Sequence, residues 1–179
     1  TIAADGDTNY HVWARLRAGG NSKWNDSLWL QFGDAIDQNG AAIYRIGSAD
    51  ALLVNLENCN GCGASGWGWQ DRGWWTGQSA IVRFASGGTH TIRVQTREDG
   101  VQIDQIVLSA AHYFWSAPGL ALNDTTIVPK SGVPGPSSLT PFTGSPVNIP
   151  GRIEAENFDN GGAGIAYADT TPGNDGNAY

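Results

Sequence analysis

The sequence predicts an all-β protein built as a β-sandwich. Short stretches of alternating apolar and polar residues recur roughly every 8 to 15 residues, with turn-forming residues between them. Charged residues make up only 15% of the 179 residues, and 25 glycines together with many Asn, Ser and Thr provide the polarity. This composition favours short strands and loops, and no segment shows a convincing helical period.

The first strand is predicted over residues 10–18, where apolar and polar positions alternate. We expect the more apolar face of this strand to be buried, and Trp13 on the other face to pack under a loop. The first face carries Tyr10, Val12, Ala14 and Leu16, and the second carries His11, Trp13, Arg15 and Arg17.

The next elements are predicted from apolar runs and turn residues. We expect strands over residues 28–32, 41–46 and 51–56, and a turn over residues 33–40, which hold two Asp, one Asn and two Gly. Residues 57–78 are expected to form a long loop, because they contain too little β-branched or alternating sequence for a strand. This loop carries half of the eight tryptophans, namely Trp67, Trp69, Trp74 and Trp75.

Three further strands are predicted over residues 79–85, 88–97 and 101–109, because turn residues separate these runs. In the last run the alternation changes phase, which places Asp104 on the side of Ile106 and Leu108. We therefore expect Asp104 to point inward. A buried carboxylate there needs a cation or hydrogen-bond donors.

The domain organisation is predicted from the prolines. Residues 1–117 are expected to form the β-sandwich module. Seven of the eight prolines lie in residues 118–150, which indicates an extended linker stiffened by proline. Residues 151–158 restart a strand pattern, but residues 151–179 are too few to make a core alone and are interpreted as an incomplete module head.

Charge and hydropathy exclude two classes of partner at this stage. Ten Lys and Arg face 17 Asp and Glu, and a net charge of −7 argues against a nucleic-acid footprint. No run of 18 apolar residues is present, so no membrane span is expected. The chain begins at Thr1 without an initiator Met, and we expect it to start inside something longer or after processing.

The only two cysteines, Cys59 and Cys62, have CxxC spacing. No second Cys or His pair accompanies them, which argues against zinc, and the glycines around them indicate a loop rather than the helix start of a thioredoxin-like site. We expect a short structural disulfide in an extracellular protein. Two free thiols are the alternative.

Residues 149–158, which contain Glu154-Ala155-Glu156, and residues 164–174 closely resemble the opening of a carbohydrate-binding module of the family 6 or family 35 type. Those modules are β-jelly-rolls of secreted polysaccharide-degrading enzymes. Residues 1–128 resemble a related galactose-binding-like module that lacks its first strands. This second resemblance rests on residues 10–15, 66–71 and 88–94, and on residues 97–108, where Asp104 precedes the final hydrophobic pair.

The resemblance implies a secreted β-sandwich of the galactose-binding-like jelly-roll type and a structural calcium ion held by Asp104, Glu154 and Glu156. Calcium takes six to eight oxygen ligands, so carboxylates completed by main-chain carbonyls suit it. In this chain the Glu-Ala-Glu element follows the Asp strand instead of preceding it. We therefore expect residues 151–179 to complete a sandwich within their own chain or in a neighbouring copy.

Carbohydrate binding needs exposed aromatic rings beside amide, carboxylate or guanidinium groups, and the tryptophan-rich segment supplies both. The alternative is that these tryptophans cover the edge of the sandwich. Trp24 with Asn25 and Asp26 is a second candidate site, and Trp115 is expected to be a structural plug. The candidate carbohydrate-binding residues are Trp67, Trp69, Gln70, Asp71, Arg72, Trp74 and Trp75.

The function predicted from these observations is non-catalytic binding of polysaccharide or another glycan, within a secreted multi-module protein. No catalytic motif or nucleophile–base spacing marks an enzyme. The alternative is a structural subunit that joins copies of itself by strand donation into an extracellular fibre or surface array.

Overall fold

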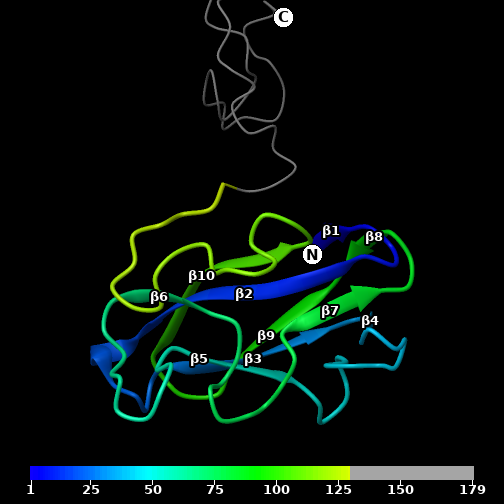
Figure 1. Cartoon of the computed structure of the whole chain (residues 1–179). Helices are drawn as coiled ribbons and strands as arrows, with labels where there is room; N and C mark the ends of the chain where they lie inside the picture. Colours follow the sequence, from blue (N-terminus) through cyan, green and yellow to red (C-terminus); the bar gives the residue numbers. More distant parts are fainter. Residues whose placement is uncertain (130–179) are drawn as a thin grey trace, which may run out of the picture. The chain divides into compact units, whose positions relative to one another are not determined.

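The structure, a computed structural model, describes residues 1–129, and it confirms the all-β class (Figure 1). The chain separates into the units Thr1–Val128 and Pro129–Tyr179. All strand pairs in the described part are antiparallel, and the only helical element there is a single 3-10 turn, Gly19–Asn21. Most of the expected linker and the expected module head, residues 151–179, lie outside the described residues. Within residues 1–129 no helix is long and apolar enough to cross a membrane.

Two main sheets form the sandwich-like body. The first, called the β2 sheet, places β2 (Asn9–Ala18) between β10 (Val101–Ser109) on one side and β6 (Trp67–Gln70) and β7 (Ile81–Phe84) on the other, and β4 (Ala35–Ile36) pairs with β7. The second, called the β3 sheet, has the order β5 (Leu52–Asn55), β3 (Ser27–Phe32) and β9 (Ile92–Thr96). A small third sheet pairs β1 (Ile2–Ala4) with β8 (Gly88–His90).

The core lies between the central strands of the two main sheets. Alternate residues of β2 and of β3 belong to one buried cluster, which confirms the alternation expected for residues 10–18. Each fully buried Val, Leu or Phe side chain contributes about 1.5–3 kcal/mol relative to exposure. The members from these two strands with at most 1% exposure are Val12, Ala14, Leu16, Ala18, Leu28, Leu30 and Phe32.

A bulge in β10 corrects the expected direction of Asp104. Ile103 pairs with Leu16 and Gln105 pairs with Arg15, so the register shifts at Asp104. The phase change in the sequence is therefore real, but the extra residue places both Asp104 and Gln105 on the outer side. Ile103 and Ile106 still pack against the core, and Asp104 forms an ion pair with Arg15 on the outer face.

Two local predictions fail for identifiable reasons. Residues 41–46 form turns with isolated bridges instead of a strand, because Tyr44 takes a positive φ of 48° that interrupts an extended chain. The preceding turn contains the short strand β4. The expected loop over residues 57–78 contains β6, in which Gly68 is needed because a Cβ there would lie 1.9 Å from the carbonyl oxygen of Ala121.

The compact unit extends beyond residue 117, where the sequence analysis began the linker. Residues 110–128, called the covering segment, pack against the β2 sheet. The backbone of Leu120 accepts a hydrogen bond from Trp69 N at 3.0 Å, and Asp124 N donates to Trp67 O at 2.7 Å, so the segment occupies the free edge of β6. The unit accordingly ends at Val128.

Candidate functional site

The tryptophan-rich segment does not form one platform, because its first half is structural. Trp69 is only 1% exposed, and its indole N–H donates to Thr126 O at 3.3 Å. The Gln70 side-chain amide is buried and donates to Leu56 O and Ala121 O. The guanidinium carbon of Arg15 lies over the Trp67 ring, 5.0 Å from the ring centroid. Trp69 and Gln70 thus hold the β2 sheet to the covering segment, and the assignment of this half of the segment to a sugar site stays a prediction.

Asp71 also belongs to the covered side of the molecule. One of its carboxylate oxygens lies 3.0 Å from His11 Nε2, and His11 Nδ1 lies 2.7 Å from Phe114 O. The His11 ring stacks on Trp13, whose indole N–H donates to Tyr113 O at 2.8 Å, so Trp13 packs under a loop as predicted. Asp71 therefore anchors the covering segment.

Trp74 and Trp75 are the exposed members of the segment. Their side chains are 47% and 48% exposed, and their ring centroids lie 5.3 Å apart in an edge-to-face arrangement. Residues 72–78 follow the free edge of β5, where Gly73 N donates to Leu53 O at 2.8 Å and Leu53 N donates to the Gln78 side chain at 3.0 Å. Arg72 precedes them with 47% of its side chain exposed. This loop therefore extends the β3 sheet sideways.

The outer face of the β3 sheet, here called the open face, holds a third tryptophan that the sequence analysis did not select. Because Leu28, Leu30 and Phe32 point into the core, the alternate residues of β3 point outward. Trp29 pairs across the sheet with Leu53 on β5 and Gln95 on β9. Of the outward residues, Trp29 and Arg93 are partly exposed and Gln95 is exposed, whereas Ser27, Gln31, Leu53 and Asn55 are buried.

A sequence signal for this face exists. Residues 28–32 were interpreted as one apolar run, but Ser27, Trp29 and Gln31 alternate with aliphatic and Phe residues. Arg93 and Gln95 repeat the polar positions on β9. Trp29 is partly exposed and Gln95 is exposed, so the face presents an aromatic ring beside amide and guanidinium groups.

Of the second candidate site, Trp24 with Asn25 and Asp26, only Trp24 is exposed. Trp24 is 72% exposed, with Lys23 Nζ 5.0 Å from its ring centroid. Asn25, however, donates to Gly19 O at 3.2 Å, and Asp26 is fully buried. Trp115 is 88% exposed, so its prediction as a structural plug is wrong.

Asp26 forms a buried acidic pair with Glu98 below the β2–β3 connection. Asp26 N donates to a Glu98 carboxylate oxygen at 3.0 Å. Burial, together with the neighbouring Glu98 carboxylate, raises the pKa of Asp26 to about 6 against a hydrogen bond from Glu57 N that lowers it. Partial burial opposes a lower pKa for Glu98, but hydrogen bonds from Asp26 and Ser27 and the charge of Arg97 lower it on balance.

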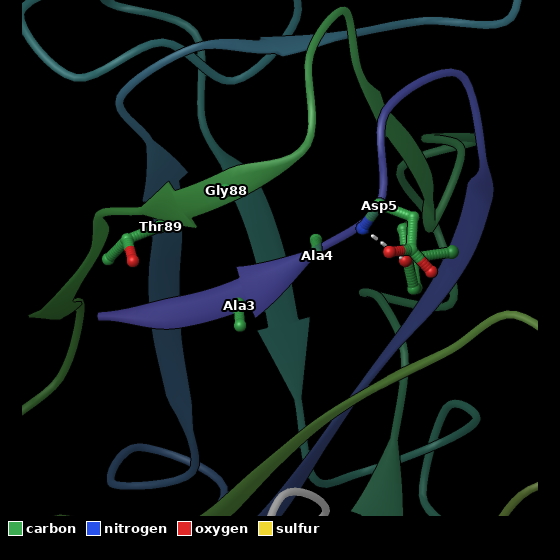
Figure 2. A pocket seen from close by; sticks show the side chains of 6 residues that line it. Ala3, Ala4, Asp5, Gly88 and Thr89 are labelled. Carbon is green, nitrogen blue, oxygen red and sulfur yellow. Dashed lines mark hydrogen bonds between the residues drawn. The ribbon is translucent and has the colours of Figure 1, made fainter.

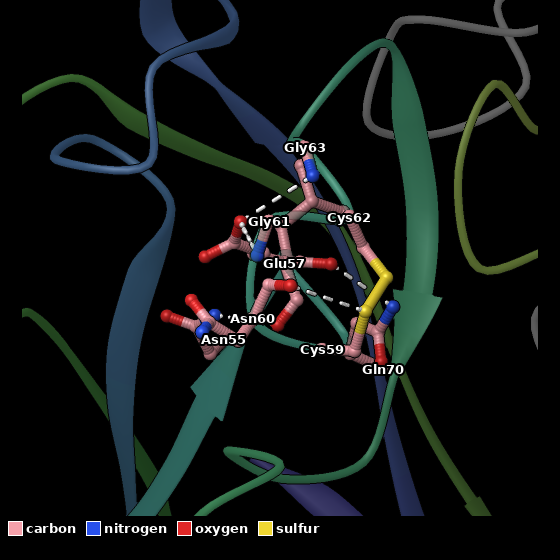
Figure 3. Close-up of a disulfide and its surroundings, with 9 residues drawn as sticks. Asn55, Glu57, Cys59, Asn60, Gly61, Cys62, Gly63 and Gln70 are labelled. Atoms are coloured by element: carbon pink, nitrogen blue, oxygen red, sulfur yellow. Dashed lines mark hydrogen bonds between the residues drawn. A yellow bond between two sulfur atoms is a disulfide. The ribbon is translucent and has the colours of Figure 1, made fainter.

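The cysteine loop lies next to this pair, and a disulfide joins Cys59 to Cys62 with the two Cα atoms 5.3 Å apart (Figure 3). One carboxylate oxygen of Glu57 accepts hydrogen bonds from Gly61 N at 3.1 Å and Gly63 N at 3.3 Å. Glu57 N in turn donates to Asp26 at 3.0 Å. These contacts give the disulfide loop a structural role.

The predicted calcium ligands are described only in part. Glu154 and Glu156 lie outside the described residues, and the carboxylate of Asp104 is paired with Arg15. Among residues 1–129, no group of three or more His, Cys, Asp or Glu side chains gathers as a metal ion requires. Calcium at this set stays a prediction.

A shallow pocket of about 350 Å³ lies beside β1 and β8 (Figure 2). Asp5 and Thr89 contribute its polar side chains, and Ala3 and Ala4 contribute small apolar ones. Tyr10 is buried there, and its hydroxyl accepts a hydrogen bond from Asp5 N at 2.8 Å. The lining of this pocket thus offers no exposed aromatic ring.

No protein-family model, curated protein or solved structure matches this chain.

Proposed function

We propose that the protein binds polysaccharide without catalysis, as a galactose-binding-like jelly-roll module of a secreted multi-module protein. The proposed binding surface is the open face together with Trp74 and Trp75 at its β5 edge. Two facing antiparallel sheets with a shared core are compatible with the jelly-roll type.

The chemistry of sugars supports this assignment. Pyranose rings present flat patches of C–H groups that pack on aromatic rings, while their hydroxyl groups need planar amide or guanidinium partners. The open face provides Trp29 for packing, and Gln95 and Arg93 on the neighbouring strand for hydrogen bonds. Such a surface suits an extended chain better than a small molecule, because it is a sheet face and not an enclosed pocket.

One observation carries the proposal, namely the paired exposure of Trp74 and Trp75 at the β5 edge of the sheet face on which Trp29 is partly exposed. Large aromatic side chains in a small domain are normally buried, and grouped exposure marks a binding surface. Here the two rings contact each other and extend the face that already contains Trp29.

The test is affinity electrophoresis of the full chain through gels that contain a panel of soluble polysaccharides. Trp29→Ala, Trp74→Ala and Trp75→Ala are each expected to weaken binding by about tenfold, as aromatic hot spots do. Trp24→Ala and Trp115→Ala are matched controls, because both remove an exposed tryptophan elsewhere. Undiminished retardation of all three open-face variants contradicts the proposal.

A second candidate function, assembly by strand donation, is favoured by a different observation. In the described part of the chain, β9 and β10 are both edge strands and each pairs with only one neighbour. The inward side chains Val101, Ile103 and Ile106 of β10 are only half-buried, unlike those of β2. An unpaired edge above incompletely buried apolar side chains is a site for strand addition.

Residues 151–158 are the proposed donor, added to another copy. The Gln105 side chain bonds both backbone groups of Val128, so the chain leaves the described unit beside β10. Light scattering of the full chain after size exclusion is the measurement. Strand donation predicts oligomers that Ala155→Pro disrupts and Ala168→Pro does not, and a monomer at every concentration rejects it.

A further inference from the structure

We propose that Asn123, in a turn of the covering segment, is an N-glycosylation site that takes a glycan from a lipid-linked oligosaccharide donor. The inference rests on the proposed secretion of the protein and does not depend on polysaccharide binding. It is carried by two acceptor motifs of the chain, which share the same middle residue but differ in their exposure.

The sequence contains two motifs of the form Asn-x-Ser/Thr in which the middle residue is not proline. Residues 25–27 form the motif Asn-Asp-Ser at the start of β3, and residues 123–125 form the motif Asn-Asp-Thr in the covering segment. Aspartate occupies the middle of both, so this position does not distinguish them. An attached glycan is bulky and must lie on the surface of the folded protein. The exposure of the first and third side chains therefore decides which motif can carry one.

The turn around Asn123 presents both of these side chains to solvent. Asn123 and Thr125 are exposed, whereas Asp124 between them is only 5% exposed. The Asp124 carboxylate accepts hydrogen bonds from Leu120 N at 2.9 Å and from Thr126 N at 2.7 Å. The middle residue thus holds the turn together from the inside, and the two residues that the modification needs point away from this role.

The backbone of Asn123 is fixed in a conformation that suits asparagine. Its φ is 53°, in the left-handed region that asparagine tolerates better than most residues. Its backbone N–H donates to Ser65 O at 3.1 Å, and its side-chain oxygen accepts a hydrogen bond from the Ser65 hydroxyl at 3.1 Å. Gly66 leaves room for this side chain, because a Cβ there would lie 2.7 Å from the same oxygen. The amide nitrogen Nδ2, to which a sugar attaches, has no hydrogen-bond partner among the described residues.

The motif at the start of β3 has the opposite exposure. The Asn25 amide donates to Gly19 O at 3.2 Å, and a Cβ at Gly100 would lie 3.3 Å from Asn25 Cγ, so the side chain is enclosed between two backbone segments. Ser27 is fully buried, and its hydroxyl accepts a hydrogen bond from Arg97 Nη1 at 3.0 Å. A glycan on Asn25 would break the first contact and meet Gly100. The folded protein is therefore expected to carry a glycan at the second motif only.

The reaction joins Nδ2 of Asn123 to C1 of the first sugar of the donor, a lipid diphosphate oligosaccharide. The bond between C1 and the diphosphate oxygen breaks, the lipid diphosphate leaves with the electron pair, and Nδ2 releases one proton to water. An oligosaccharyltransferase of the secretory pathway catalyses this transfer in the lumen of the endoplasmic reticulum. Disulfides form in the same compartment, and the bond between Cys59 and Cys62 is compatible with folding there.

The site belongs to a different sheet from the proposed binding surface. Asp124 N donates to Trp67 O at 2.7 Å, which places the motif beside β6 of the β2 sheet. Trp29 is on β3, and the loop that carries Trp74 and Trp75 follows the edge of β5. A glycan at Asn123 is therefore expected to leave the affinity for polysaccharide unchanged.

The experiment secretes the full chain from a eukaryotic cell line behind a cleavable signal peptide. The secreted protein is treated with peptide N-glycosidase in ¹⁸O-labelled water, which converts each glycosylated asparagine into a labelled aspartate, and its peptides are measured by mass spectrometry. We expect the label at Asn123 in most secreted chains and no detectable label at Asn25. Before the treatment, the intact chain is expected to be heavier by the mass of one N-linked glycan.

Three variants test the motif itself. Thr125→Ala is expected to abolish the label at Asn123, because it removes the hydroxyl that the transferase needs, and Thr125→Ser is expected to retain it. Thr126→Ala is the matched control, since it removes an exposed threonine just outside the motif and should keep the label.

The remaining outcomes separate this site from the proposed function. An unlabelled Asn123 in the secreted wild type overturns the inference, and so does a label that persists in Thr125→Ala. A comparable label at Asn25 also overturns it, because exposure in the folded protein would then not select the site. A glycosylated chain that no polysaccharide retards, before or after glycosidase treatment, contradicts the proposed function and leaves the glycosylation site standing.

Discussion

The outer faces of the two main sheets have similar residues but different surroundings. The β2 sheet carries Trp13, Arg15 and Trp69 on its outer side, all buried under the covering segment. The β3 sheet carries Trp29 and Arg93 on its outer side, where both are partly exposed, although Gln31 on the same face is buried and bonds to the loop over residues 45–50. The residue type is therefore a poor guide to function, and coverage of the sheet face decides it.

The two arginines show the same contrast. Arg15 is 4% exposed, and its charge is met by Asp104, by the carbonyl of Asp124 and by the ring of Trp67. Arg93 has only a neutral amide oxygen. The Arg15 side chain is thus used within the fold, although its Nε–H has no hydrogen-bond partner among the described residues, whereas the partly exposed Arg93 has no ion-pair partner there.

The largest expected effect is the difference in unfolding free energy lost when a tryptophan is removed from each of the two faces. Trp69→Ala is expected to lower the free energy of unfolding by about 3–5 kcal/mol, because it removes a fully buried ring and leaves a cavity. Trp29→Ala, on the open face, is expected to cost less than about 1 kcal/mol. Urea unfolding followed by circular dichroism measures both, and equal losses would show that the open face is as structural as the covered one.

A smaller effect concerns the pH dependence that the Asp26–Glu98 pair gives to stability. The pKa of Asp26 is about 6 in the folded state against an ordinary value of 3.8, so the folded state binds this proton more tightly than the unfolded chain does. The stability that the proton contributes is lost as the pH rises through 6. The lowered pKa of Glu98 has the opposite sign: the stability it contributes is present above its ordinary pKa of 4.5 and is lost as the pH falls below that value. Between pH 4.5 and 6 we expect the free energy of unfolding to fall by roughly 2 kcal/mol.

Asp26→Asn should flatten this slope, because asparagine does not titrate. Asp7→Asn, in an exposed turn, is the matched control and should preserve it. A wild-type stability that stays constant or rises between pH 4.5 and 6 would contradict the raised pKa of Asp26.

The smallest effect comes from the disulfide. Cys59 and Cys62 are separated by only three positions, so reduction frees a short loop and is expected to cost about 1–2 kcal/mol. Because this loop is bonded to Asp26 and not to the open face, polysaccharide affinity should stay unchanged in Cys59→Ser/Cys62→Ser. A loss of affinity with little change in stability would extend the binding surface to the cysteine loop.

The sequence predicts the fold class well and the site only in part. Alternation in residues 10–18 identifies β2 and its buried face, and the phase change at Asp104 identifies the bulge. It does not give the direction of Asp104, because an inserted residue reverses the side on which the following residues lie. The strand over Trp67–Gln70 was missed because pairing with β2 and the covering segment stabilises it, and no local preference marks it.

The amino-acid composition of the tryptophan-rich segment does not show which of its tryptophans are exposed and which belong to the core. Trp69 and Trp74 lie five residues apart in one tryptophan-rich stretch, yet one is buried by Thr126, distant in the sequence, and the other is exposed. Contacts between distant segments determine which tryptophans are free, and a single sequence does not reveal them. Trp29 was detectable from its alternation with Leu28 and Leu30, but the apolar run concealed it.

The most direct test of the account is a titration of the full chain, with ¹⁵N-labelled tryptophan, by oligosaccharides prepared from the polysaccharides that retard it in affinity electrophoresis. The eight indole N–H signals report on both faces at once. The account predicts that the signals of Trp29, Trp74 and Trp75 shift with a common dissociation constant, while those of Trp13, Trp67 and Trp69 stay in place. Shifts confined to the second group, or to Trp24 and Trp115, would contradict binding at the open face.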